Sequence, residues 1–153
     1  MPNLIFEASD APLDSFEFIS FLHLFRAAYA RSLEVAGQDA PDEIVKQKQH
    51  YAELFGKEFN SPGISQNATK VSERFYSNLG TSELNFVRIN KSSPLEIGCI
   101  CVVSALTLAV IVSGGEVDIK GLKFKLRPLG VGIKNLRAAL RIPQPKRENK
   151  NPK

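Results

Sequence analysis

The feature that most constrains this chain is a run without charge in its second half. No residue between Glu96 and Glu116 carries a formal charge, and residues 97–113 hold no ionisable side chain apart from two cysteines. A surface helix would show a polar stripe at a spacing of 3.6 residues, and this run shows none. The run therefore belongs either in a lipid bilayer or in the middle of a folded domain.

The residues at the two ends of the run predict one long helix over 94–113. Ser93, Pro94 and Glu96 match a capping box: the serine caps the helix, the proline takes its first position and the glutamate reaches back to the cap. Gly114-Gly115 is typical of a helix end. Such a helix has about 20 residues and a length of about 30 Å.

The cysteines of the chain, Cys99 and Cys101, both lie inside this run. On a helix, two residues that are two positions apart point roughly 200° away from each other. We therefore expect two reduced thiols that behave as small buried hydrophobes and share neither a disulfide nor a metal ion.

Two locations for this helix stay open. A length of about 20 apolar residues matches a hydrocarbon core about 30 Å thick, which predicts a transmembrane helix. The positive-inside rule would then place the N-terminal part outside, although the N-terminus does not resemble a signal peptide. The alternative is a soluble domain in which strand 84–90, the helix and strand 117–126 form a βαβ unit. The helix would then be buried between a small sheet and a phenylalanine-rich helix.

The other segments predict an α+β fold that is mainly helical with a few short strands. Hydrophobic periodicity and turn residues set the elements. We expect strands over 3–8, 83–90 and 116–126, the last with a phase slip at Gly121, and helices over 14–35, from Pro41 onward, over 67–79 and over 133–142.

Four regions follow from these elements. Residues 1–91 form a small α/β N-terminal region, and residues 92–115 contain the apolar helix. Residues 116–142 contain a strand and a basic amphipathic helix, and residues 143–153 are rich in proline and charge, which is typical of a disordered tail.

Charge divides the chain into two unequal parts. Residues 1–115 hold 9 Lys/Arg against 13 Asp/Glu, a net charge of −4, whereas residues 116–153 hold 11 against 3, a net charge of +8. A basic third predicts a polyanionic partner, for which an anionic membrane surface is favoured over nucleic acid. The residues expected to contact it are Lys120, Lys123, Lys125, Arg127, Lys134, Arg137 and Arg141.

Motifs that carry chemistry are missing from the sequence. It contains no glycine-rich nucleotide-binding motif, no H-E-x-x-H and no G-x-S-x-G. The two histidines, His23 and His50, fall on different predicted helices, and neither has a visible partner for catalysis. We therefore expect a protein that is not an enzyme and that holds no cofactor and no metal ion.

The strings "INKSSPLEI", "SGGEVDI" and "RPLGVGIKNLR" resemble small, poorly characterised bacterial proteins in which an S-P-L-E-I box opens an apolar helix. The likeness covers roughly residues 86–140. It implies a bacterial protein with a membrane-associated or interaction role, and it alone suggests a defence or stress setting.

These observations together predict a non-enzymatic, membrane-associated interaction or oligomerising protein. Helix 94–113 would anchor it in the inner membrane, the basic segment would lie on anionic headgroups, and a protein partner or a second copy would bind it. The alternative is a cytoplasmic βαβ-containing module that binds a protein or nucleic acid through its basic C-terminal third.

Overall fold

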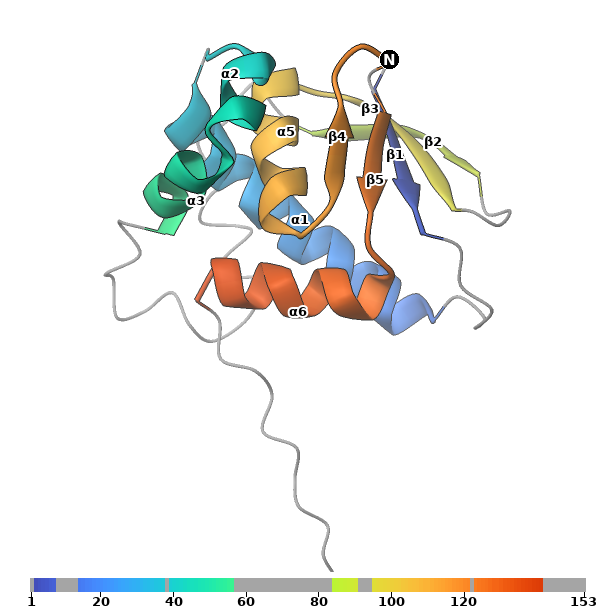
Figure 1. Ribbon diagram of the computed structural model, residues 1–153. Helices are drawn as coiled ribbons and strands as arrows, with labels where there is room; N and C mark the ends of the chain where they lie inside the picture. The colour runs from blue at the N-terminus through green and yellow to red at the C-terminus, as the bar shows by residue number, and fades with distance from the viewer. Residues whose placement is uncertain are drawn as a thin grey trace, which may run out of the picture.

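The computed structural model describes residues 2–7, 14–37, 39–56, 84–90, 95–121 and 123–141. In this part of the chain, a five-stranded mixed sheet has helices gathered on one side (Figure 1). The predicted α+β class is confirmed. The predicted helix over 67–79 and the predicted tail over 143–153 lie outside the described residues.

The sheet has the strand order β2-β3-β1-β5-β4. Strand β1 (Asn3–Phe6) is central and runs antiparallel to β3 (Glu96–Ile100) and parallel to β5 (Lys123–Leu126). Strands β2 (Asn85–Asn90) and β4 (Glu116–Asp118) form the two edges. The N-terminal strand therefore holds together two segments from the second half of the chain.

Side chains alternate between the two faces of the sheet, as the period of a strand requires. Leu4 and Phe6 of β1 and Phe124 and Leu126 of β5 are buried. The ring of Phe6 meets the ring of Phe21 in the helix layer at a centroid distance of 5.1 Å. One face of the sheet therefore packs against the core. The other face carries the remaining side chains of these strands, and we call it the open face.

Helix α1 (Ser15–Ala36) lies at the centre of the helix layer and agrees with the predicted helix over 14–35. Asp14 caps it, since its carboxylate accepts a hydrogen bond from the backbone N–H of Phe16 at 2.8 Å. Gly37, at φ 52°, ends it in the left-handed region that glycine favours.

Two helices replace the single helix predicted from Pro41. Helix α2 (Pro41–Lys46) ends at Gln47, whose backbone leaves the helical region, and helix α3 (Lys48–Gly56) begins directly after it. Both helices pack against α5, and α3 also packs against α1.

The predicted helix over 94–113 is wrong in its first half. Residues Glu96–Ile100 form strand β3, and helix α5 (Val103–Val112) begins only at Val103. Strand β3 fills the place between β1 and β2, where its backbone groups find partners in both neighbours. Tertiary pairing thus overrides the local capping signal.

The capping role predicted for Glu96 is therefore wrong, because this residue lies in a strand. Ser93 and Pro94 lie outside the described residues. Helix α5 has 10 residues, which corresponds to a length of about 15 Å. In the described ranges no helix is both long and apolar enough to cross a bilayer, so the predicted span over 94–113 is overturned.

Helix α5 is apolar on all sides because protein surrounds it. It packs against α1, α2, α3, β4, β5 and helix α6 (Leu129–Ala139). Residues 104–110 are buried and the other three are half-buried. Thr107 donates its hydroxyl to the carbonyl of Val103 at 2.7 Å, and Ser104 donates to the carbonyl of Gly37 at 2.9 Å. The structure agrees with the alternative of a core helix between the sheet and α1.

The βαβ order expected in this alternative is present, but with a different first strand. The predicted first strand, 84–90, is β2, and it is followed by the antiparallel strand β3 before the helix begins. Strands β3 and β4 run parallel and are joined through α5, and β1 and β5 lie between them. The single strand predicted over 116–126 is a hairpin of β4 and β5. Its turn includes Gly121, the position of the predicted phase slip, whose N–H donates to the Asp118 carboxylate at 3.4 Å.

Candidate functional site

The seven basic residues predicted to contact a polyanion do not share one surface. Lys123 and Lys125 alternate with the buried residues of β5, so they project from the open face of the sheet. Lys134 is exposed on α6, which belongs to the helix layer on the other side. The structure therefore divides the basic C-terminal third between two faces of the molecule.

Acidic neighbours offset the positive charge of the open face. In the register of β4 and β5, Asp118 lies opposite Lys123 and Glu116 lies opposite Lys125. Such cross-strand pairs of opposite charge stabilise a sheet. Together with the exposure of all four residues, they indicate a solvated face.

Arg127 and Lys120 belong to the same region of the chain. Arg127 forms an ion pair with Glu7 at 3.0 Å, between the ends of the parallel strands β5 and β1. Lys120 is exposed in the turn of the hairpin. Neither residue therefore turns the open face into a cluster of positive charge.

Helix α6 carries basic residues and no acidic residue, so its charge is not offset within the helix as the charge of β5 is offset by β4. Lys134, Arg137 and Arg141 follow at helical spacing, of which Lys134 and Arg141 are exposed and Arg137 is half-buried. Arg141 lies just beyond the helix and lines a depression of about 440 Å³ together with His50 and Glu53 of α3. The three cations thus extend along α6 toward the end of α3.

Large apolar side chains are exposed where α1 and α6 begin. Phe16 is 83% exposed and Ile19, one turn later in α1, is 52% exposed. Val131 in the first turn of α6 is 39% exposed. We call Phe16, Ile19, Val131 and Lys134 the α1–α6 end.

The two helices approach closely at this end (Figure 1). A Cβ atom on Gly132 would lie 2.9 Å from Cε2 of the buried Phe21, so only glycine fits the crossing point. Because Gly132 is next to Val131 and Phe21 follows Ile19 by two residues, the crossing brings the exposed side chains to one end of the helix layer.

The sequence did not single out the α1–α6 end. Phe16 and Ile19 lie in the predicted helix over 14–35 at a spacing that puts them on its apolar side with Phe21 and Phe25, but of these four only Phe21 and Phe25 are buried. Periodicity shows which side of a helix is apolar. It cannot show which part of that side another element covers, because this depends on where α6 crosses α1.

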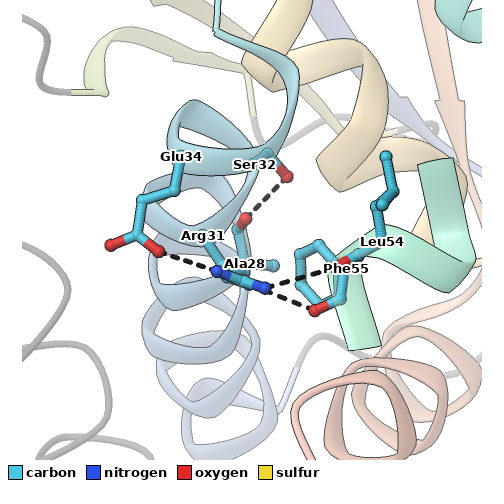
Figure 2. A network of polar contacts seen from close by, with 6 residues as sticks. All are labelled: Ala28, Arg31, Ser32, Glu34, Leu54 and Phe55. Atoms are coloured by element: carbon cyan, nitrogen blue, oxygen red, sulfur yellow. Dashed lines mark hydrogen bonds and ion pairs between the residues drawn. The ribbon is translucent and has the colours of Figure 1, made fainter. Parts of the chain in front are cut away.

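A polar network joins α1 to α3 (Figure 2). The guanidinium group of Arg31, which is buried, donates to the carbonyls of Phe55 and Leu54 at 3.1 and 3.2 Å and binds Glu34 at 2.8 Å. The last carbonyls of a helix lack partners within the helix and carry partial negative charge. Arg31 supplies these partners for α3, so its role is structural.

A second polar cluster lies where β3 passes into α5. The sulfur atoms of Cys99 and Cys101 are 3.9 Å apart, and the hydroxyl oxygen of Tyr29 accepts a hydrogen bond from the N–H of Val102 at 2.9 Å. The sequence-based prediction that these thiols point apart is wrong, because it assumed a helix. Cys99 lies in strand β3 and Cys101 in the bend that follows, so both sulfurs reach the same side.

The environment of this cluster changes its acidity. Burial raises the pKa of Tyr29 to about 12. A hydrogen bond from Cys101 lowers the pKa of the Cys99 thiol, and the same contact together with burial raises the pKa of Cys101. The pair therefore holds one proton between two sulfurs more tightly than isolated thiols would.

Comparison with family models, with curated proteins and with solved structures gives no significant match to this chain. The resemblance based on the S-P-L-E-I box thus stays an expectation. In the part of the chain that the structure describes, no three or more His, Cys, Asp or Glu side chains come together in a way that would hold a metal ion.

Proposed function

We propose that this chain is a non-enzymatic domain that binds the surface of an anionic membrane through the α1–α6 end, without spanning the bilayer. The observation that carries the proposal is the 83% exposure of Phe16 at an end where α6 contributes only basic charge. An exposed cluster of large apolar side chains on a folded domain is typical of a contact surface.

The two kinds of side chain at the α1–α6 end suit the two layers of a membrane surface. Apolar side chains enter the boundary between headgroups and acyl chains, whereas a long lysine side chain keeps its ammonium group at the headgroups. Full burial of a phenylalanine is worth about 1.5–3 kcal/mol, and each cation near an anionic leaflet contributes about 1 kcal/mol. Phe16 and Lys134 are therefore expected to dominate binding.

Two acidic residues beside Phe16 oppose an anionic surface. Asp14 caps α1 and Glu17 lies in its first turn, where the helix dipole stabilises both. Their presence makes the proposed binding weak and reversible, and it supplies a further test. Reversal of the charge of Glu17 leaves the core untouched because this side chain is exposed.

Flotation with lipid vesicles tests the proposal. We expect the protein to float with vesicles of phosphatidylglycerol and phosphatidylcholine, to bind pure phosphatidylcholine vesicles much less, and to lose binding as salt screens the charges. Phe16→Ser should weaken binding by at least about fivefold and Lys134→Glu by about tenfold. Glu17→Lys should strengthen it by about tenfold.

Val87→Thr is the matched control, since Val87 is also exposed, at 49%, but lies on the edge strand β2 far along the sheet from β5. This variant should bind as the unchanged protein does. The proposal is overturned if the unchanged protein stays unbound on anionic vesicles at low salt, or if Phe16→Ser binds as tightly as Val87→Thr.

The alternative, a module that binds a protein or nucleic acid through the basic C-terminal third, finds less support because the basic residues lie on two faces. It predicts that Lys123→Glu and Lys134→Glu weaken the binding of a DNA or RNA oligonucleotide alike. Our proposal predicts that Lys123→Glu leaves vesicle binding unchanged, because the open face does not belong to the α1–α6 end.

A further inference from the structure

The pair of cysteines at the junction of β3 and α5 has a use that the membrane proposal does not require. Its sulfur atoms, 3.9 Å apart, are in van der Waals contact. A disulfide needs about 2.05 Å between the sulfurs, so a relative movement of roughly 2 Å closes the gap. A change of this size is within reach of a bend between a strand and a helix.

The two sulfurs differ in access and in freedom to move. Cys99 is fully buried, and its N–H donates to the carbonyl of Pro2 at 3.1 Å within the sheet. Cys101 is half-buried and lies in the bend, next to Ile100, which is 60% exposed. Cys101 is thus the sulfur that an outside molecule meets first, and Cys99 is held behind it.

We propose that Cys99 and Cys101 form a dithiol site that a low-molecular-weight disulfide of the glutathione type oxidises to an internal disulfide. Cys101 passes its proton to Cys99 across the contact between the sulfurs. The Cys101 thiolate then attacks one sulfur of the small disulfide, forms a mixed disulfide and releases one small thiolate, which takes up the proton from Cys99. The thiolate of Cys99 then attacks the sulfur of Cys101 and displaces the second small thiolate. Two protein thiols are oxidised, and one small disulfide is reduced to two thiols.

The proton arrangement of the reduced pair prepares the first step. The Cys101 thiol donates toward Cys99, which lowers the pKa of Cys99, so the reduced pair has thiolate character and the proton can move along this contact when Cys101 attacks. Once Cys101 carries the small thiol, Cys99 faces a disulfide bond at contact distance. The internal step then competes against a dilute outside thiol with a large advantage in effective concentration.

Oxidation is transmitted to α5 through Val102. Cys99 is held in the sheet, so closure moves Cys101, and Val102 directly follows it as the N-cap residue of α5. The N–H of Val102 donates to the hydroxyl oxygen of Tyr29 in α1. Closure of the disulfide therefore disturbs the contact that fixes the first turn of α5 on α1.

The experiment incubates the folded protein in glutathione buffers of increasing oxidised fraction and measures its intact mass. We expect the unchanged protein to lose two hydrogen atoms and to carry no adduct. Cys99→Ala should instead accumulate one glutathione on Cys101, at least about tenfold more than the unchanged protein, because no resolving sulfur is present. Cys101→Ala should stay reduced, because Cys99 is buried.

Circular dichroism of each variant shows that it is folded, and hydrogen exchange at Val102 reports the change at α5. Faster exchange of this amide in the oxidised protein supports the proposal. The proposal is overturned if the folded protein keeps both thiols in strongly oxidising buffer while the urea-unfolded chain reacts, or if it takes up glutathione on both cysteines.

Discussion

At the scale of single residues, Arg31 shows how a charged side chain is used inside the helix layer. Arg31 is a charged residue in the helix predicted over 14–35, and the structure buries it against the end of α3. Spacing alone cannot predict this burial, since the partner carbonyls come from residues more than 20 positions away. What the sequence did predict was the helix itself, over 14–35, which agrees with α1.

Arg31→Ala should lower the free energy of unfolding by about 2–3 kcal/mol, because the carbonyls of Leu54 and Phe55 lose charged donors in a buried place. Urea unfolding followed by circular dichroism measures the loss. Glu34→Ala is the control: the Glu34 side chain is 55% exposed, so its ion pair with Arg31 should be worth less than about 1 kcal/mol. Equal losses in both variants would contradict the role given to Arg31.

Two glycines of α6 give a matched pair for the crossing of α1 and α6. Gly132→Ala should cost about 1–3 kcal/mol, because the new methyl group meets the ring of the buried Phe21. Gly130→Ala should raise stability by up to about 1 kcal/mol, since a Cβ there meets nothing within 4 Å and alanine favours a helix. Thermal unfolding compares them, and a stable Gly132→Ala variant would argue against the close crossing.

Tyr29 predicts a dependence of stability on high pH. Burial raises its pKa in the folded protein to about 12 from an unfolded value of 10.0, so the folded state favours the neutral phenol. The stability that this group contributes is fully present below about pH 10 and is lost as the pH rises toward 12. In Tyr29→Phe this part of the decline should be missing. Phenolate absorbance and urea unfolding over this pH range measure both effects, and an unchanged decline would contradict the assignment.

At the scale of elements, the run 97–113 shows what a sequence can and cannot reveal. The absence of charge correctly indicates that most of this run is buried, although Ile100 is 60% exposed. It does not distinguish lipid from protein or helix from strand. Short apolar segments buried on both sides occur in strands and in core helices alike. The capping box then favoured a helix, and pairing of β3 with two neighbours overrode it.

Val110→Asp should abolish cooperative unfolding of the whole domain, because it places a carboxylate among α5, the sheet and α1. Ile100→Thr, on a side chain that is 60% exposed, should change stability by less than about 1 kcal/mol. Circular dichroism against temperature measures both. A Val110→Asp chain that keeps a normal melting transition would contradict the burial of α5.

At the scale of the whole molecule, β1 and α1 bring together what the sequence suggested were separate regions. Strand β1 lies between β3 and β5, and α1 packs against both α5 and α6. Net charge along the chain marks residues 116–153 as basic, but charge along a sequence does not show how the cations are arranged on the surface. Lys123 and Lys125 project from the open face because side chains alternate along β5, whereas the cations of α6 lie in the helix layer on the other side of the sheet.

The central claim is that the uncharged run is folded as strand β3 and helix α5 inside one domain. Native-state hydrogen exchange of the protein in buffer without detergent or lipid tests it most directly. We expect the amides of residues 97–100 and 106–112 to exchange as slowly as those of the buried residues 27–32 in α1. Added vesicles should leave their exchange unchanged. Fast exchange of these amides in buffer, with protection only after vesicles are added, would contradict the account.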